Sequence, residues 1–248
     1  MKTIHGNKLA VIMEMKAKAL FSKNFIIMPV FAIGFTFIMK LIYGSIAGSG
    51  GMNDQLKGMA LSYGALMNIT MTGIYCVSAA LAEEKEKHTL RALMTSSVNG
   101  LEFFLGSLIP VIAMVTVVNA VLVPVVGFRM NGVQWAVYIS VSLLAAVASG
   151  VIGMIFGIFA KNQITAGTLT TPALLVLMMI PMFSGLNAAL GKISDFLFTG
   201  VMVQIVENMA SGSEKLVNAS SIIVIVTEII AAVVCFLVIY RRNGYDSE

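Results

Sequence analysis

Six apolar runs, each about as long as a bilayer is thick, constrain this chain more than any other feature. They fall at residues 25–43, 58–82, 101–126, 135–160, 164–184 and 221–240. A helix needs roughly 20 apolar residues to cross the hydrocarbon core. A soluble domain of 248 residues would need more than 11% charged residues to cover its surface. We therefore predict an all-α membrane protein with six transmembrane helices, forming a single transmembrane domain over residues 1–248.

The distribution of lysine and arginine predicts the orientation of the chain, because loops on the cytoplasmic side carry an excess of these residues. With the amino terminus inside, most of them fall in cytoplasmic segments: Lys2, Lys8, Lys16, Lys18, Lys23, Lys85, Lys87, Arg91, Lys161, Arg241 and Arg242. Fewer fall outside: Lys40, Lys57, Arg129, Lys192 and Lys215. We expect both termini to be cytoplasmic.

The segment before the first span, residues 1–24, has apolar residues at helical spacing. They are Leu9, Ile12, Met13, Ala17 and Leu20. We expect an amphipathic helix in the inner membrane interface, with lysines near anionic headgroups. Lys16 falls inside the apolar stripe and weakens the pattern, so a solvated basic segment is the alternative.

Residues 185–219, between the fifth and sixth spans, contain two further apolar stripes. The first lies in residues 186–197 and the second in residues 201–209, with Gly200 between them. Backbone inside a membrane must satisfy its own hydrogen bonds, so we predict two re-entrant half-helices in the outer leaflet. Pro181 and Gly185 mark the bend into them. Pro181, Gly185 and Gly200 are candidate outer-gate residues.

The densest charge cluster lies between the second and third spans, in residues 83–98. It starts with the string EEKEK, which cannot enter hydrocarbon cheaply. Leu90, Leu93 and Met94 follow at helical spacing and give one apolar side. Asn99 and Glu102 have the spacing of a capping box at the start of the third span. The pattern predicts a helix, a break and a second helix, with a solvated loop as the alternative.

This stretch also carries a resemblance to a known family. The string EKEKHTLRALM (residues 84–94), then SVN (97–99), Glu102 and Leu105-Gly106, resembles the signature of ABC-type-2 transporter permeases. In that family E-x-E-x-G-T-L-E-x-L-L is followed by S-P-V-S and E-x-x-x-G-K. This chain differs at His88, Arg91, Val98 and Ser107. An amphipathic entry helix, six spans and a re-entrant pair extend the resemblance over essentially the whole chain.

The resemblance implies that residues 83–98 include a coupling helix that docks in a groove of a separate ABC ATPase. The candidate coupling residues are Glu84, Lys85, Glu86, Lys87, Thr89, Leu90, Arg91, Leu93 and Met94. Two ATPase subunits would bind the ATP and Mg, and two permeases would pair as a homodimer or heterodimer. The implied function is export of an amphipathic peptide, drug or lipid-like substrate across a bacterial cell membrane.

Polar residues inside the spans are candidates for a translocation path. They are Asn68, Thr72, Asn119 and Glu228. Hydrogen bonding between helices is the alternative for the first three, and a protonated acid facing neighbouring helices is the alternative for Glu228. The sequence has no phosphate-binding loop G-x-x-x-x-G-K-[ST], no catalytic set and no metal signature. We expect no enzymatic activity, no cofactor and no nucleic-acid partner for this chain.

Two other functions are compatible with the same fold. In a proton-coupled secondary transporter, Glu228 would carry the proton, although no inverted repeat is evident. In an immunity or sensor subunit, the chain would recognise or remove an antimicrobial peptide. The charge cluster favours the ATP-driven exporter.

Overall fold

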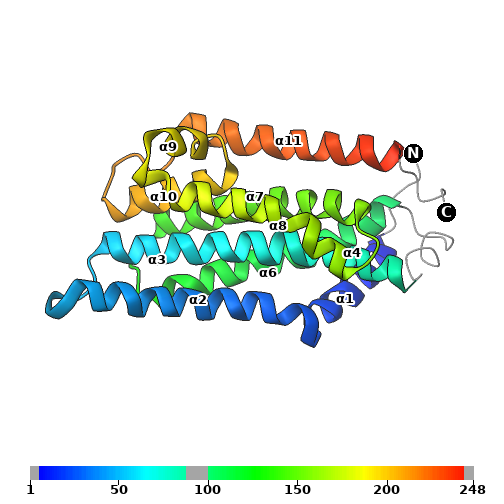
Figure 1. The fold of residues 1–248 in the computed structure, drawn as a ribbon, viewed down its shortest axis with the longest axis horizontal. Coiled ribbons are helices and arrows are strands. Elements are labelled where there is room, and N and C mark those ends of the chain that lie inside the picture. Colours follow the sequence, from blue (N-terminus) through cyan, green and yellow to red (C-terminus); the bar gives the residue numbers. More distant parts are fainter. Residues whose placement is uncertain (1–5, 88–99, 243–248) are drawn as a thin grey trace.

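The computed structural model describes residues 6–87 and 100–242, and this part of the chain is helical without strands (Figure 1). Six helices or helical runs within these two ranges are long and apolar enough to cross a membrane. They are α2 (Lys23–Ala47), the run α3–η2–α4 (Asp54–Glu86), α6 (Gly100–Val126), α7 (Gly132–Phe159), α8 (Gln163–Met182) and α11 (Ala219–Arg242). The predicted class and the predicted spans are confirmed, with ends that shift by a few residues.

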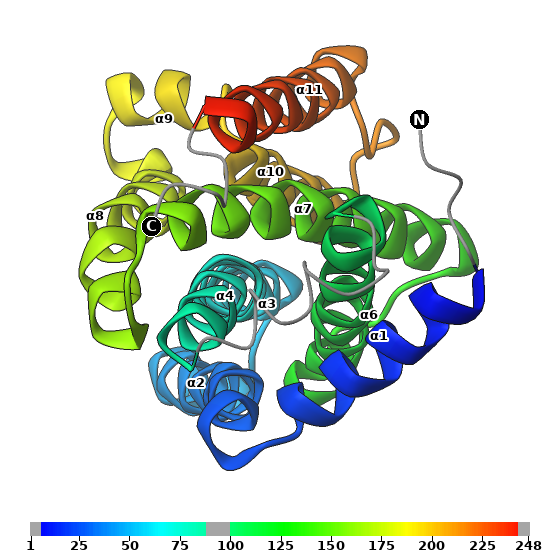
Figure 2. The ribbon, with the colours of Figure 1, turned by 90° about the vertical axis from the view of Figure 1, so that its right-hand side faces the viewer.

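The second span forms the centre of the bundle. It is 83% buried over its most apolar 18 residues, whereas the same measure is 22% for α2 and 17% for α11. Seen along the bundle in Figure 2, α3 and α4 are surrounded by α2, α6, α7 and α8. The second span therefore contacts α2, α6, α7 and α8.

Glycines allow the helices around the second span to approach it closely. A Cβ on Gly64 would lie 1.9 Å from Thr36 Oγ1 of α2, and one on Gly73 would lie 2.1 Å from Ser149 Oγ of α7. A Cβ on Gly153, in the G-x-x-x-G string of α7, would lie 2.6 Å from the carbonyl oxygen of Ile74. Small residues at helix interfaces permit such close packing in membranes.

The second span is not a uniform α-helix. It consists of α3 (Asp54–Met67), the π-helical segment η2 (Asn68–Tyr75) and α4 (Cys76–Glu86). A π-helix has one residue more per hydrogen-bonded turn than an α-helix and is frequent at functional sites. The sequence predicted one continuous span here, because apolar periodicity does not reveal an inserted residue.

Helix α1 (Gly6–Leu20) lies at the end of the bundle where α4 and α11 end, which we call the charged end (Figures 1 and 2). It packs on α6: a Cβ on Gly106 would lie 2.6 Å from Ile12 Cγ2. Ile12 and Leu20, two residues of the apolar stripe, are buried within the protein. The place of α1 in a membrane interface stays a prediction.

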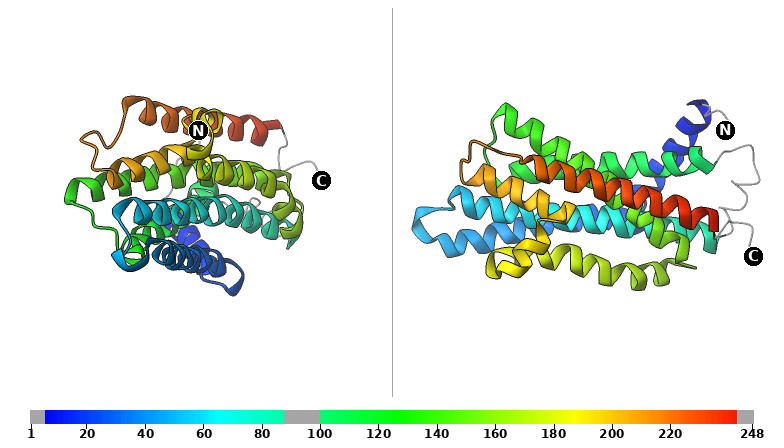
Figure 3. Two further views of the ribbon diagram at one scale, coloured as in Figure 1. Left: turned by 60° about the vertical axis from the view of Figure 1, so that its left-hand side comes forward. Right: turned by 90° about the horizontal axis from the view of Figure 1, so that it is seen from above.

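At the opposite end, a short turn η1 (Gly48–Gly50) follows α2, and a bent helix pair lies between α8 and α11 (Figure 3). The pair follows η3 (Ser184–Leu186) and consists of α9 (Ala188–Ser194) and α10 (Phe198–Ala210), which meet at 107°. Two helices were predicted in this region. Their re-entrant location stays a prediction.

The break between α9 and α10 corrects one expectation from the sequence. It falls at residues 195–197, and Gly200 lies inside α10 instead of separating the two helices. A Cβ on Gly200 would lie 1.9 Å from the carbonyl oxygen of Ser194. The glycine is therefore needed for close contact between the end of α9 and the start of α10, and it does not break the helix.

Candidate functional site

The candidate site lies at the charged end of the second span, where α4 ends at Glu86. Residues 83–87 are the part of the predicted coupling segment that the structure describes. Glu83, Glu84 and Lys85 are partly buried, whereas Glu86 and Lys87 are exposed. Successive helical residues point in different directions, so this short run has both an inward and an outward side.

Lys85 holds the end of α7. Its Nζ donates hydrogen bonds to the carbonyl oxygens of Gly157 at 3.0 Å, Ala160 at 3.3 Å and Ile158. The last carbonyls of a helix have no partner within the helix, and a cation there also meets the negative end of the helix dipole. Lys85 thereby joins the second span to the fourth.

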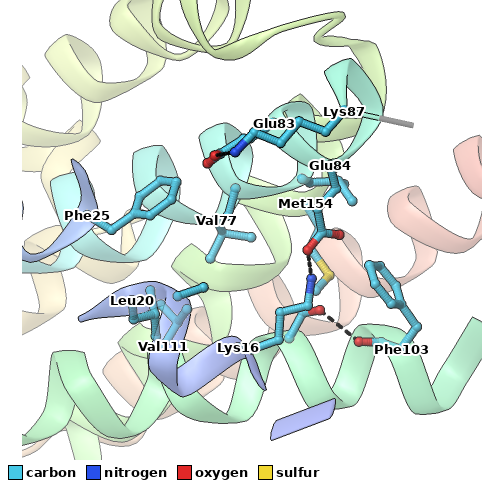
Figure 4. A pocket seen from close by; sticks show the side chains of 14 residues that line it. Lys16, Leu20, Phe25, Val77, Glu83, Glu84, Lys87, Phe103, Val111 and Met154 are labelled. Carbon is cyan, nitrogen blue, oxygen red and sulfur yellow. Dashed lines mark hydrogen bonds and ion pairs between the residues drawn. The ribbon is translucent and has the colours of Figure 1, made fainter. Parts of the chain in front are cut away.

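Glu84 forms an ion pair with Lys16 of α1 (Figure 4). Lys16 is the residue that interrupted the apolar stripe, and it is 8% exposed. Its Nζ also lies 4.5 Å from the centroid of the Phe103 ring in α6, a cation–π geometry. The apparent defect in the stripe is thus the contact that joins α1 to the second span.

Burial affects the charge of Lys16. It lowers the pKa of Lys16 to about 7, because the ammonium group is largely removed from water. The Glu84 carboxylate opposes this shift, since a nearby negative charge favours the protonated amine. An ion pair at this depth contributes little net stability, but removal of one partner leaves an uncompensated charge.

Glu83 joins α4 to α8. Its Oε2 accepts a hydrogen bond from Gln163 Nε2 at 2.6 Å, and its Oε1 forms an ion pair with Lys87. Gln163 is the first residue of α8. Glu83, Glu84 and Lys85 therefore bind the end of α4 to α8, α1 and α7, and we call these residues the tie cluster.

A cavity of about 220 Å³ lies beside the tie cluster (Figure 4). Its apolar wall consists of Ala19, Leu20, Phe25, Val77, Ala80, Leu81, Phe103, Val111 and Met154. Its polar lining consists of Lys16, Glu83, Glu84, Lys87 and Ser107. The cavity is therefore amphipathic, with charged groups from α1 and α4 next to a wall of hydrocarbon and aromatic groups.

Several predicted coupling residues lie outside the described residues: Thr89, Leu90, Arg91, Leu93 and Met94. Asn99, the predicted cap of the third span, also lies outside them. Glu102 lies in the first turn of α6 and is 1% exposed. A carboxylate in the first turn meets the positive end of the helix dipole.

Inside the bundle, the structure brings Asn68, Thr72 and Asn119 together. Asn68 Nδ2 donates to Asn119 Oδ1 at 2.8 Å, and Thr72 Oγ1 donates to Asn68 Oδ1 at 3.0 Å. Asn119 Nδ2 also donates to Ser142 Oγ at 3.2 Å, and the hydroxyl of Tyr138 donates to the carbonyl oxygen of Asn119. All five residues are buried.

This polar network joins η2, α6 and α7 and supports hydrogen bonding between helices, the alternative that the sequence left open. Buried amides and hydroxyls with partners hold neighbouring helices in one arrangement. The sequence did not identify Ser142 and Tyr138 as members, because nothing in their spacing indicates which span they contact. A role of the network in a translocation path stays a prediction.

Glu228 does not join that network. It lies on α11, and its Oε2 accepts a hydrogen bond from the backbone N–H of Phe198 at 2.5 Å. Phe198 is the first residue of α10, whose own preceding residue, Leu197, provides no side-chain cap. A carboxylate at this place satisfies an N–H group with no partner within the helix and meets the positive end of the dipole. Glu228 therefore fastens the bent pair to the last span.

The other candidate gate residues lie where α8 ends. Pro181 is in the last turn of α8, and Gly185 lies in the short turn η3 that leads to α9. The Tyr63 hydroxyl of α3 donates to the carbonyl oxygen of Met182 at 3.1 Å and so holds this end of α8 against the second span. Function as a gate stays a prediction.

Within residues 6–87 and 100–242, no group of three His, Cys, Asp or Glu side chains is placed to hold a metal ion. The described part of the chain instead combines two features. Its second span is buried by the other spans, and one end of that span is fastened to its neighbours by charged side chains. Together these features define a multi-pass helical membrane protein whose central span is fastened to its neighbours at one end.

The family model described as ABC-2 type transporter matches residues 11–203 of this chain. The match covers well over half of the 248 residues, and the chain belongs to the ABC-2 type transporter family. It is a transport permease, and membership implies association with an ATP-binding subunit. The comparison with curated proteins gave no match.

Proposed function

We propose that the chain is the permease subunit of an exporter whose separate ATPase subunits supply the energy. The observation that carries this proposal is the tie cluster. It fastens the end of α4 to α1, α7 and α8 directly before the residues that resemble a coupling helix. A force on those residues would reach four helical elements at once.

The charged end faces the cytoplasm in this proposal. Lysines and arginines gather there, as expected for the inner side of a membrane. They include Lys8, Lys16, Lys18, Lys85, Lys87 and Lys161. Both termini are then cytoplasmic, and the membrane is the cell membrane of a bacterium.

Two ATPase subunits dock at residues 84–94, one on each of two permeases that pair as a homodimer or heterodimer. Glu86 and Lys87 are exposed and available for polar contacts with them, whereas Leu90, Leu93 and Met94 supply the apolar contacts. The ATPase subunits bind the ATP and Mg, and the permease itself holds no cofactor and has no ATP site.

The bent helix pair acts as the outer gate of the exporter. Pro181 and Gly185 lie where the chain turns into the pair, and Gly200 allows its two helices to meet closely. Glu228 connects the pair to α11. Movement of the second span reaches α10 directly, because a Cβ on Gly58 of α3 would lie 2.8 Å from Ala210 Cβ. The substrate is an amphipathic peptide, drug or lipid-like molecule.

Co-purification with the cognate ATPase tests the docking claim. Glu86→Ala combined with Leu90→Ala removes one exposed charge and one apolar contact, and we expect it to reduce the recovered ATPase at least about tenfold, the effect of losing one or two interface contacts. The matched control is Glu214→Ala with Leu186→Ala, which removes an exposed acid and an exposed leucine at the opposite end. Unchanged recovery with the first pair would refute docking at this site.

A further inference from the structure

The cavity beside the tie cluster is large enough for a small apolar group. Its volume is about 220 Å³, and engineered apolar cavities of roughly 150 Å³ already bind benzene. Leu20, Val77, Val111 and Met154 surround it, and the ring of Phe103 lies at its polar side (Figure 4). An aromatic ring or a short branched chain would fit.

The polar side of the cavity already contains a subsite for a cation. The protein's own ammonium group, on Lys16, lies between the Glu84 carboxylate and the face of the Phe103 ring. A carboxylate and an aromatic face are the two groups that recognise an ammonium ion in a partly dry site. Any amine attached to a group in the cavity would meet the same two partners.

The two acidic side chains at the cavity are largely removed from solvent, and each is paired with a lysine. Glu83 and Glu84 both line the cavity and are only 20% and 19% exposed in their side chains. The partner of Glu83, Lys87, has a side chain that is 64% exposed. The Lys87 ammonium nevertheless lies at the Glu83 carboxylate, so Glu84, which lies beside the Phe103 ring through its contact with Lys16, is the carboxylate that would receive an amine.

We propose that this cavity is a binding site for cationic amphiphiles, in which a protonated amine replaces the Lys16 ammonium beside Glu84 and Phe103 while an apolar ring or chain fills the cavity. The proposal rests on the proposed function only in taking such a ligand to be the cargo. Binding itself requires no ATPase.

Displacement of Lys16 is chemically feasible. Burial lowers its pKa to about 7, so its amine can lose the proton near neutral pH when a ligand brings a second positive charge. Lys16 therefore competes with the ligand, and its removal should strengthen binding.

Protection of a cysteine in the cavity provides the measurement. Ser107→Cys in a Cys235→Ser background places a thiol in the lining, while the remaining Cys76 is buried. The purified permease in nanodiscs is labelled with a maleimide in the presence of 4-phenylbutylamine, neutral 4-phenylbutanol or anionic 4-phenylbutyrate. We expect the amine to protect the thiol at concentrations about tenfold lower than the alcohol, since it adds a charged contact. Ser213→Cys, in an exposed loop at the opposite end, controls for general effects on labelling.

Charge variants test the cation subsite. Glu84→Gln should weaken protection by the amine about tenfold, whereas Lys16→Met should strengthen it about three- to fivefold. Each single variant removes one member of the Lys16–Glu84 ion pair and could therefore misfold. The double variant Lys16→Met with Glu84→Gln removes both charges and controls for this effect. This double variant should fold, and the amine and the alcohol should protect its cavity thiol at equal concentrations.

Cavity variants test the apolar part. Ala80→Phe fills the space and should abolish protection, and Ala231→Phe, on an exposed face of α11, should leave it unchanged. Equal protection by amine and alcohol in the unaltered cavity, or weaker protection in Lys16→Met that folds, would overturn the proposal. Binding of the amine without its ATP-driven export would leave the binding site standing and would refute only the assignment of the amine as cargo.

Discussion

At the scale of single residues, the charged side chains at the end of α4 have different roles although they are neighbours in sequence. Lys85 and Glu84 face inward to α7 and α1, whereas Glu86 is exposed. From the sequence, all of these residues were predicted to contact the ATPase. The sequence could not separate inward from outward residues, because that division depends on which helices surround α4.

Lys85→Met tests the inward role of Lys85. The variant removes hydrogen bonds to three carbonyl oxygens at the end of α7 and should lower stability by about 1–3 kcal/mol, the usual cost of losing charged hydrogen bonds. Thermal unfolding in detergent measures it. Lys87→Met is the matched control: its side chain is 64% exposed, and such changes usually stay within about 0.5 kcal/mol. An equal loss of stability in both variants would contradict the inward role of Lys85.

Glu228 is the second residue with a specific expected effect. Its bond to the Phe198 N–H should slow hydrogen exchange at that amide, and Glu228→Leu should abolish this protection. Glu228→Gln keeps an accepting oxygen, so it should retain much of the protection and tolerate ATP-driven transport. Loss of transport in Glu228→Gln, with protection intact, would favour the proton-carrying alternative.

At the scale of elements, the apolar runs sufficed to locate the spans because length and hydrophobicity alone decide whether a helix can cross a membrane. Features that depend on contacts between residues could not be predicted from length and hydrophobicity. They include the π-helical segment η2, the position of the break between α9 and α10, and the pairing of Lys16 with Glu84. The last pair is separated by 68 positions, and no spacing rule connects such residues.

Close packing between η2 and α7 gives a prediction at this scale. A Cβ on Gly73 would lie 2.1 Å from Ser149 Oγ, so Gly73→Ala should destabilise the bundle by about 1–3 kcal/mol through overpacking. Adding Ser149→Gly should restore much of that loss. Gly34→Ala in α2 is the control: its Cβ would meet no atom within 4 Å, and alanine favours a helix. Chemical denaturation in mild detergent would measure the stability of each variant. If Gly73→Ala is as stable as the unaltered protein, the close packing of η2 on α7 is contradicted.

At the scale of the whole molecule, a buried second span, the tie cluster at one end and a bent helix pair at the other form one connected unit. Membership of the ABC-2 type transporter family implies association with an ATP-binding subunit, which is the source of force in the proposed function. A permease driven by such a subunit must have residues 83–87 on the side of the membrane where ATP is present.

Sided labelling of Glu86→Cys in a Cys235→Ser background tests this requirement most directly. Glu86 is exposed, so an impermeant maleimide should reach it only after cells are opened, whereas Ser213→Cys should react in intact cells. Reaction of Glu86→Cys in intact cells would place the end of the second span outside, beyond the reach of any cytosolic ATPase, and would contradict the account.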